Sequence, residues 1–268
     1  MNDKFVRVGP LKDLSSYPQW AQDLVRDCAE SKQRVVRHEL FYMMRDNRLS
    51  KELTRNFLVA VWPVIEQFPQ YMSLNLLKVH YGRNRGQDLA RRYLIRNIRV
   101  EQNHADYWME WAAACDISLE ELLYGSVPLA THALSHWCWH TCERDDLAAS
   151  MAATNYAIEG ATGEWATLVC SSDAYENSFP PEVRKNAMRW LKVHAHYDDA
   201  HPWEALDIVC TIMGQNPPAA NVKFIGDSIR KSYEYMRMTL DYCLLTDKFE
   251  NIGFSSATPM QQQERRRT

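Results

Sequence analysis

Apolar residues recur at intervals of three and four along most of this chain, which is the repeat expected of amphipathic helices. In the first such segment the apolar positions include Trp20, Leu24 and Cys28. Capping residues mark the starts of others: Ser50 precedes the second segment, and residues 118–121 form a capping box before a short one. We therefore expect long helices over residues 17–45, 50–78, 87–115, 128–142, 146–170, 182–213 and 221–245.

The helical pattern continues without an internal repeat, a low-complexity linker or a shift in composition. This continuity predicts an all-α fold, a single-domain bundle of about seven helices that spans residues 1–253. Residues 254–268 are polar and nearly end in a Glu-Arg-Arg-Arg run, so we expect a disordered tail there.

Composition and charge argue against several classes of protein, among them nucleic-acid-binding, membrane-spanning and secreted proteins. The chain has 268 residues, and its net charge of −3 gives no reason to expect nucleic acid as a partner. The longest apolar run, residues 57–65, is too short for a membrane span, and the N-terminus shows no secretory signal. Seven cysteines are scattered without a framework spacing. We therefore expect a reduced, cytoplasmic protein.

The most informative stretch is residues 194–201, which has the sequence His-Ala-His-Tyr-Asp-Asp-Ala-His. On a continuous helix His194, Asp198 and His201 fall within about 60° of one another. Two imidazoles and a carboxylate on one stripe suit a divalent metal such as iron. Taken alone, the stripe is also compatible with a solvated polar face.

Two further segments favour the metal. Glu101 and His104 have the i, i+3 spacing of the Glu-x-x-His motif that carboxylate-bridged di-iron proteins use inside helical bundles. Glu159 lies in a run of small and apolar residues, where a charge is costly without a cation. Three carboxylates and three histidines match the usual ligand count of a di-iron site.

Other candidates stay open at this stage. His136, Cys138, His140 and Cys142 have i, i+4 spacings that zinc uses, although a Cys-x-x-Cys knuckle is absent from the segment. Glu66 is the one charge in an apolar stretch, and it is either a partner or ligand of the metal or a member of a buried salt bridge.

The order Glu101-x-x-His104, Glu159, His194-x-x-x-Asp198-x-x-His201 resembles that of the haem-oxygenase-like di-metal oxidases, whose helical fold is shared with thiaminase-type proteins. Longer blocks, including residues 96–108, 132–140, 153–165 and 197–206, are similar to the bacterial fatty-acid decarboxylases that form 1-undecene. The similarity covers about residues 5–243.

This resemblance implies oxidative decarboxylation of medium-chain saturated fatty acids, dodecanoic acid above all, to terminal alkenes and CO2 through removal of a β-hydrogen. The implied cofactor is Fe(II), two ions per chain, with O2 as co-substrate and an external, unidentified electron donor. Glu101, His104 and His194 would hold one iron, and Glu159, Asp198 and His201 the other. Ala161 and Gly163 are small residues that would leave room for the fatty chain.

Rival interpretations keep the fold and change the chemistry. A related di-iron oxidase would act on an amino acid or amine, which needs a further acidic partner for the ammonium group. A metal-free thiaminase-type hydrolase would use Cys138 or Cys142 as nucleophile. A helical protein that binds haem or lipid without catalysis is the remaining alternative.

Overall fold

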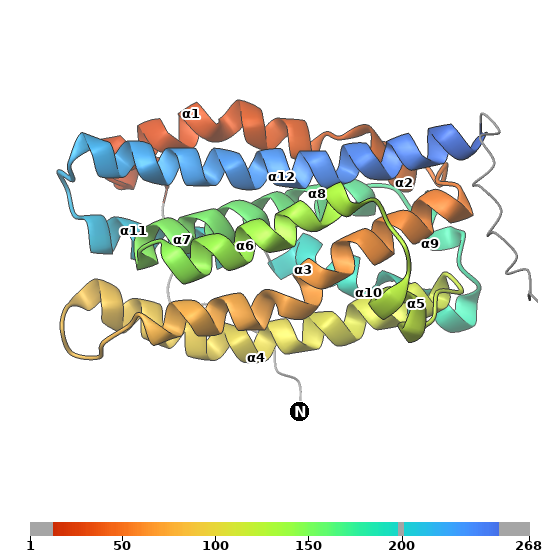
Figure 1. Ribbon diagram of the computed structural model, residues 1–268, viewed down its shortest axis with the longest axis horizontal. Coiled ribbons are helices and arrows are strands. Elements are labelled where there is room, and N and C mark those ends of the chain that lie inside the picture. Colours follow the sequence, from red (N-terminus) through yellow and green to blue (C-terminus); the bar gives the residue numbers. More distant parts are fainter. Residues whose placement is uncertain (1–12, 198–200, 252–268) are drawn as a thin grey trace, which may run out of the picture.

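The computed structural model describes the backbone of residues 13–197 and 201–251 and the side chains within 13–195 and 201–245. Every regular element in these ranges is helical, which confirms the predicted all-α class (Figure 1). The elements are η1 (Leu14–Ser16), α1 (Gln19–Val36), α2 (Glu39–Arg45), α3 (Lys51–Leu77), α4 (Arg85–Ala114), α5 (Leu119–Tyr124), η2 (Leu129–His132), α6 (Ala133–Arg144), α7 (Leu147–Met151), η3 (Ala152–Ile158), α8 (Glu159–Cys170), α9 (Ala174–Asn177), α10 (Pro181–Tyr197), α11 (His201–Met213) and α12 (Ala219–Asn251).

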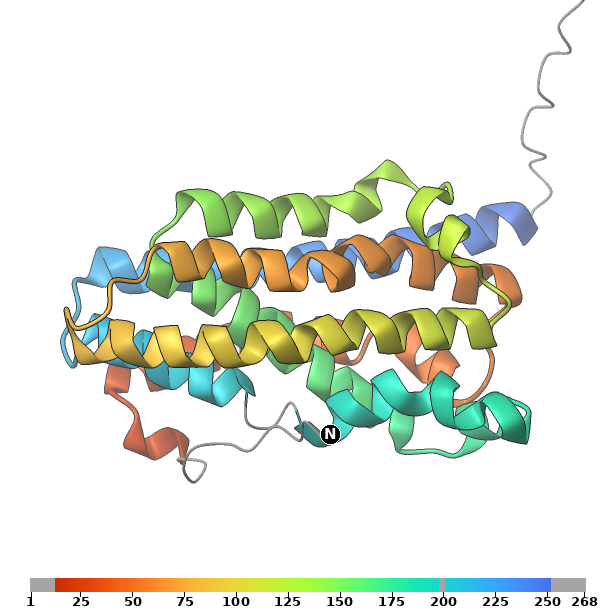
Figure 2. The same cartoon turned by 90° about the horizontal axis from the view of Figure 1, so that it is seen from below.

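The long helices α3, α4 and α12 follow the long axis of the molecule (Figure 1). Figure 2 shows α3 and α4 side by side, with α6 beyond α3 and α10 beyond α4. Helix α8 packs against α10 and α1, and α12 covers α1 and η3. As a result, α4, α8, α10 and α11 surround a common interior region.

The predicted helix starts have the expected caps. The Ser50 hydroxyl accepts a hydrogen bond from the Leu53 amide at 2.9 Å, and the Ser118 hydroxyl accepts one from the Glu121 amide at 3.1 Å. Asn84 caps α4 in the same way through the amide of Gln87. Each cap satisfies an amide that has no partner within its helix.

The described residues contain more helices than the about seven expected, in part because several predicted helices are divided. Residues 17–45 form α1 and α2, and residues 146–170 form α7, η3 and α8. The predicted helix 182–213 corresponds to α10 and α11, between which residues 198–200 lie outside the described residues. Pro202 stands in the first turn of α11, the part of a helix where the missing amide of a proline removes no hydrogen bond.

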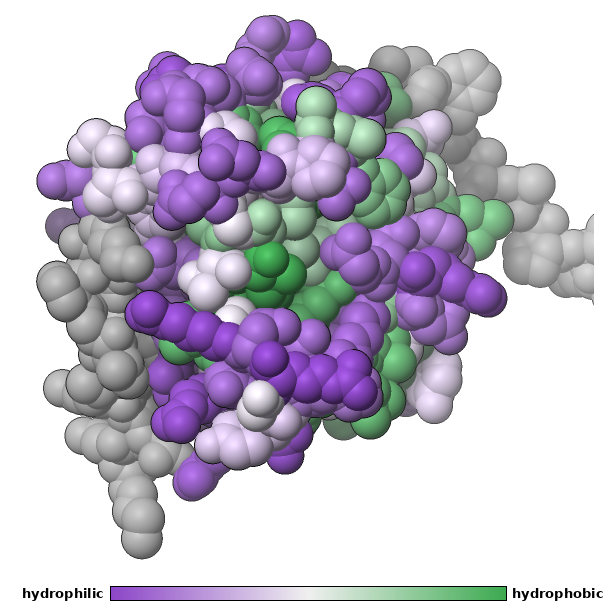
Figure 3. Space-filling model, turned by 90° about the vertical axis from the view of Figure 1, so that its left-hand side faces the viewer, coloured by the Kyte–Doolittle hydropathy of each residue, from purple (hydrophilic) through white to green (hydrophobic). Residues whose placement is uncertain are grey.

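Aromatic rings form much of the core beside this region. Trp108, Trp111 and Trp190 are at most 1% exposed, and Phe41 stacks on Trp165 with ring centroids 4.4 Å apart. At the end of the molecule that lies on the left of Figure 1, hydrophobic residues are visible at the centre of a mainly hydrophilic surface (Figure 3). Among the described residues, no helix is long and apolar enough to cross a membrane.

Candidate metal centre

Four helices contribute buried ionisable side chains to the interior. Glu101 and His104 lie on α4, Glu159 is the first residue of α8, His194 lies on α10, and His201 is the first residue of α11. All five side chains belong to residues no more than 6% exposed. Asp198, the sixth predicted ligand, lies outside the described residues. Burial of so many ionisable groups is costly unless they bind something.

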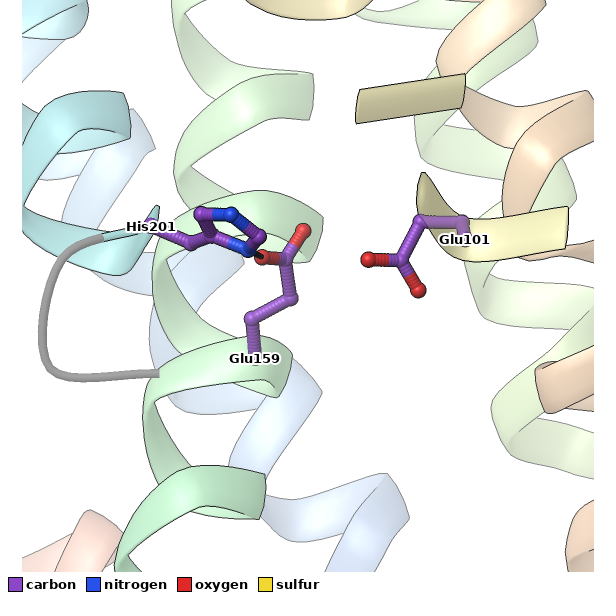
Figure 4. Close-up of side chains that lie close together, drawn as sticks. All are labelled: Glu101, Glu159 and His201. Atoms are coloured by element: carbon purple, nitrogen blue, oxygen red, sulfur yellow. Dashed lines mark ion pairs between the residues drawn. The ribbon is translucent and has the colours of Figure 1, made fainter. Parts of the chain in front are cut away.

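Glu101, Glu159 and His201 form the centre of this group. One ligand atom from each residue lies within 4.8 Å of the other two. Figure 4 shows the two carboxylates pointing toward one another from opposite helices, with the His201 ring beside Glu159. The ion pair between His201 Nδ1 and Glu159 Oε2 measures 3.5 Å. Such a cluster could hold a metal ion.

His104 and His194 stand next to this centre in a matching arrangement. His104 Nδ1 lies 2.9 Å from Glu101 Oε2, and His194 Nδ1 lies 2.8 Å from the Trp190 carbonyl oxygen. The two rings have centroids 4.3 Å apart. A neutral ring that donates from Nδ1 carries its lone pair on Nε2, and this is how metal-binding histidines are usually held.

Burial sets the charge of these groups. Desolvation lowers the pKa of His104 to about 3 and that of His194 to about 3, and the neighbouring histidines act in the same direction. Both imidazoles are therefore neutral at pH 7. Desolvation also raises the pKa of Glu101 and of Glu159, an effect that the nearby His201 opposes. Without a cation, the two carboxylates are the unfavourable part of the cluster.

The donor set fits iron. Carboxylate oxygens and imidazole nitrogens are ligands that non-haem iron takes in proteins, and helical bundles build such sites from facing helices. Glu101, His104, Glu159, His194 and His201 would supply these atoms, together with Asp198 as predicted from the sequence. His194 lies on α10 and His201 on α11, and the segment between them, which the predicted stripe requires to be helical, lies outside the described residues.

The sequence pattern missed the element that precedes Glu159. Residues Ala152–Ile158 form a π-helix, a rare element that is frequent at functional sites. Within it, the Asn155 Nδ2 group donates to Glu159 Oε1 at 2.6 Å. Asparagine in an otherwise small and apolar run was the available signal, because such a residue needs a buried partner.

An apolar cavity of about 70 Å³ opens on the cluster. Its ionisable wall comes from α4, α8 and α10, whereas α3, α6 and α12 contribute no ionisable group to the described lining. From α8 the lining includes Thr162 and Trp165, but neither Ala161 nor Gly163, so the space expected at those two residues is not part of this cavity. The lining residues are Phe41, Phe57, Val61, Val64, Ile65, Phe68, Glu101, His104, Leu134, Ile158, Glu159, Thr162, Trp165, Trp190, His194, Met236, Thr239 and Leu240.

The residues of the alternative zinc site, and Glu66, are not brought together with other metal ligands among the described residues. Cys138 and Cys142 are fully buried, whereas His136 and His140 on the same helix are exposed, so one zinc ion cannot collect all four. Glu66 is half-buried and belongs neither to the described cavity lining nor to the Glu101–Glu159–His201 group. None of the seven cysteines is paired with another in the structure.

Comparison with known proteins supports the same fold and chemistry. Residues 55–225 match a protein family described as iron-containing redox enzymes. The crystal structure of a TenA homologue from Pseudomonas syringae pv. tomato is similar over 91% of this chain and 100% of that chain, with 54% sequence identity and a TM-score of 0.86.

More distant structures share the fold. A domain of unknown function with a haem oxygenase-like fold from Shewanella denitrificans has 13% identity and a TM-score of 0.70 over 93% of this chain and 99% of that chain. A TenA homologue from Pyrococcus furiosus has 12% identity and a TM-score of 0.67 over 84% and 100%. A search of curated proteins found no match. The chain therefore belongs to the family of iron-containing redox enzymes and has the haem-oxygenase-like fold of TenA proteins.

Proposed function

We propose that this protein is a non-haem iron oxidase that converts medium-chain fatty acids, dodecanoic acid above all, to terminal alkenes such as 1-undecene and CO2. The proposed ligands of two iron ions are Glu101, His104, Glu159, His194, Asp198 and His201. One observation carries the proposal: buried carboxylates and neutral imidazoles lie on one wall of a cavity that is otherwise apolar.

The electron balance defines what the reaction needs. Conversion of a fatty acid to a terminal alkene and CO2 releases two electrons and two protons. Reduction of O2 to water takes up four of each, so an external reductant must supply the remaining two electrons. Bound iron supplies the capacity to activate O2 and to accept single electrons. The protein's own contribution is to position the substrate and to exclude water.

The charges of the cavity lining determine the orientation in which a fatty acid would bind. The described cavity lining contains two carboxylates and no lysine or arginine. His104 and His194 are neutral because burial lowers their pKa to about 3. A substrate carboxylate would therefore be repelled from the metal-free cluster and attracted to it only when cations are bound. The alkyl chain would lie along the apolar side of the cavity.

The cavity must widen to accept this substrate. Its volume of about 70 Å³ is less than half that of an apolar cavity of roughly 150 Å³ that holds benzene. Met236 lines the apolar side, and methionine changes shape easily because it is unbranched. Rotation of such side chains is therefore part of binding.

A thiaminase-type hydrolase is the second candidate. The 54% identity to a TenA homologue favours it, and the comparisons support this alternative more directly than they support a fatty-acid substrate. Against it, Cys138 and Cys142 are buried, do not line the described cavity, and have raised pKa values, that of Cys142 reaching about 12. Such thiols are poor nucleophiles.

The experiment that tests the proposal starts from metal-free protein loaded anaerobically with Fe(II). Dodecanoic acid, a reductant and O2 are added, and 1-undecene is measured by headspace gas chromatography. Alkene is expected from the wild type and from Glu164→Ala, an exposed neighbour paired with Lys32, but not from Glu159→Ala.

Thiamine serves as the competing substrate. Because thiamine is a cation, the metal-free acidic cavity should favour it, whereas fatty acid binding should require the metal. Thiamine cleavage by metal-free protein, without alkene from the loaded protein, would establish the hydrolase instead. Iron-dependent O2 uptake with an amine but not with dodecanoic acid would keep the oxidase and change its substrate.

A further inference from the structure

The π-helix before Glu159 contains a buried polar side chain, that of Asn155. All seven residues of η3 are buried, and Asn155 has an exposed fraction of 0%. The Thr154 hydroxyl donates a weak hydrogen bond to Asn155 Oδ1 at 3.3 Å. The same hydroxyl donates to the Ser150 carbonyl oxygen at 2.8 Å. The amide group of Asn155 therefore has a fixed orientation.

Because of this orientation, the two carboxylate oxygens of Glu159 have different partners. Asn155 Nδ2 donates to Oε1 at 2.6 Å, while Oε2 faces His201 Nδ1 at 3.5 Å. A carboxylate with one oxygen held by a protein donor offers the other oxygen to a cation. Since ligands are usually oriented by hydrogen bonds from residues behind them, the arrangement has the form of a support for a metal ligand.

From this geometry we infer that Asn155 is a positioning residue, which holds Glu159 Oε1 so that Oε2 binds the metal. The inference rests on the proposed iron site and adds a residue that the ligand pattern does not contain. Asn155 lies within the π-helix and Glu159 directly follows it, and π-helices are frequent at functional sites.

The decisive variant is Asn155→Leu, which keeps a similar size and removes the donor. We expect its affinity for Fe(II) to fall by about 10–100-fold, measured by anaerobic titration of the metal-free protein against a competing chelator. The visible absorption of bound Co(II) should also change, because its band intensities follow coordination geometry. A purely structural role for Asn155 would leave that spectrum unaltered.

Two further variants separate positioning from folding. Asn56→Leu removes another buried asparagine, whose Oδ1 accepts from Arg55 at 3.0 Å and which lies outside the described lining of the cavity. It should lose stability and keep the wild-type affinity. Thr154→Val leaves Asn155 in place but frees its amide, and a smaller loss of affinity is expected; this variant decides the question if Asn155→Leu does not fold.

The outcomes distinguish this inference from the proposed function. If the wild type binds Fe(II) and Asn155→Leu or Thr154→Val binds it equally well with the same Co(II) spectrum, the positioning role is wrong and the oxidase proposal survives. If iron binds and depends on Asn155 but no alkene forms, the positioning role stands and the substrate is wrong. A wild type that binds no iron would overturn both.

Discussion

Gly160 and Pro202 lie in direct contact: a Cβ atom added to Gly160 would stand 3.2 Å from the Pro202 Cβ. Each of these residues follows a candidate ligand, Glu159 on α8 and His201 on α11. The absence of a side chain at Gly160 therefore lets the two helix starts approach closely enough for His201 and Glu159 to form their 3.5 Å ion pair.

Gly160→Val should separate these two ligands. The added methyl groups overlap Pro202, so we expect a loss of about 1–3 kcal/mol in the free energy of unfolding and weaker Fe(II) binding. Denaturant titration and metal titration measure the two effects. Ala113→Val, at an exposed position of α4, provides the same β-branched residue in a helix and should change neither by much. Unchanged metal affinity in Gly160→Val would show that the close approach does not set the site.

Glu101→Gln should make the metal-free protein more stable while removing metal binding. Desolvation raises the pKa of Glu101, which means that the buried carboxylate is less favourable than its neutral form. Replacement by a neutral amide is expected to increase the free energy of unfolding at pH 7.5 by about 0.5–2 kcal/mol. Equal or lower stability of the variant would contradict the electrostatic account of the cluster.

Acid should destabilise the metal-free protein through its buried histidines. Above pH 6.5, His104 and His194 are neutral in both the folded and the unfolded chain. Below pH 6.5 the unfolded chain takes up protons, while the folded chain does not until about pH 3, so the free energy of unfolding falls across this window. The comparison of pH 7.5 with pH 5.0 should show a smaller fall in His194→Gln than in the wild type.

The buried carboxylates act in the opposite direction. Because the pKa values of Glu101 and Glu159 are raised, the folded chain binds protons before the unfolded chain as the pH falls, and this stabilises it down to about pH 4.5. Metal binding must displace these protons. Calorimetry in buffers of different ionisation enthalpy should therefore detect more proton release per metal at acidic than at alkaline pH. Release that does not vary with pH would exclude these carboxylates as ligands.

Under the proposed function, the apolar side of the cavity should set the preferred chain length. Leu134 of α6 belongs to that side, and Leu134→Phe should shift turnover from dodecanoic toward shorter acids. Leu122→Phe enlarges a buried leucine of α5 outside the described lining and serves as the matched control. Competition between acids of different length, followed by product analysis, gives the ratio directly. An identical ratio in both variants would mean that the chain lies elsewhere.

The sequence alone was sufficient to predict which candidate side chains lie together where they belong to a single regular helix. Glu101 and His104 lie one turn apart on α4, and the helical repeat places them on one face. Glu159 was predictable because a charge in an apolar run needs a partner. His194 and His201 were correctly predicted to lie inside, and the continuity of the helix that suggested it depends on residues outside the described ranges.

Two features could not be predicted from periodicity. Every residue of η3 is buried, so the segment shows no contrast between polar and apolar faces from which a π-helix could be distinguished from an α-helix. Pro202 of α11 contacts Gly160 of α8, a residue that lies far away in the sequence. Such contacts are invisible in the local pattern.

The stacking of Trp190 on His194 gives the molecule an intrinsic optical reporter. Their ring centroids lie 3.8 Å apart, and the indole is 1% exposed, so solvent contributes little to its emission. A transition-metal ion bound at His194 would sit within contact range of an excited indole and should quench its fluorescence. Each arrival or departure of metal at this end of the cluster can thus be followed in unlabelled protein, in real time and without catalysis.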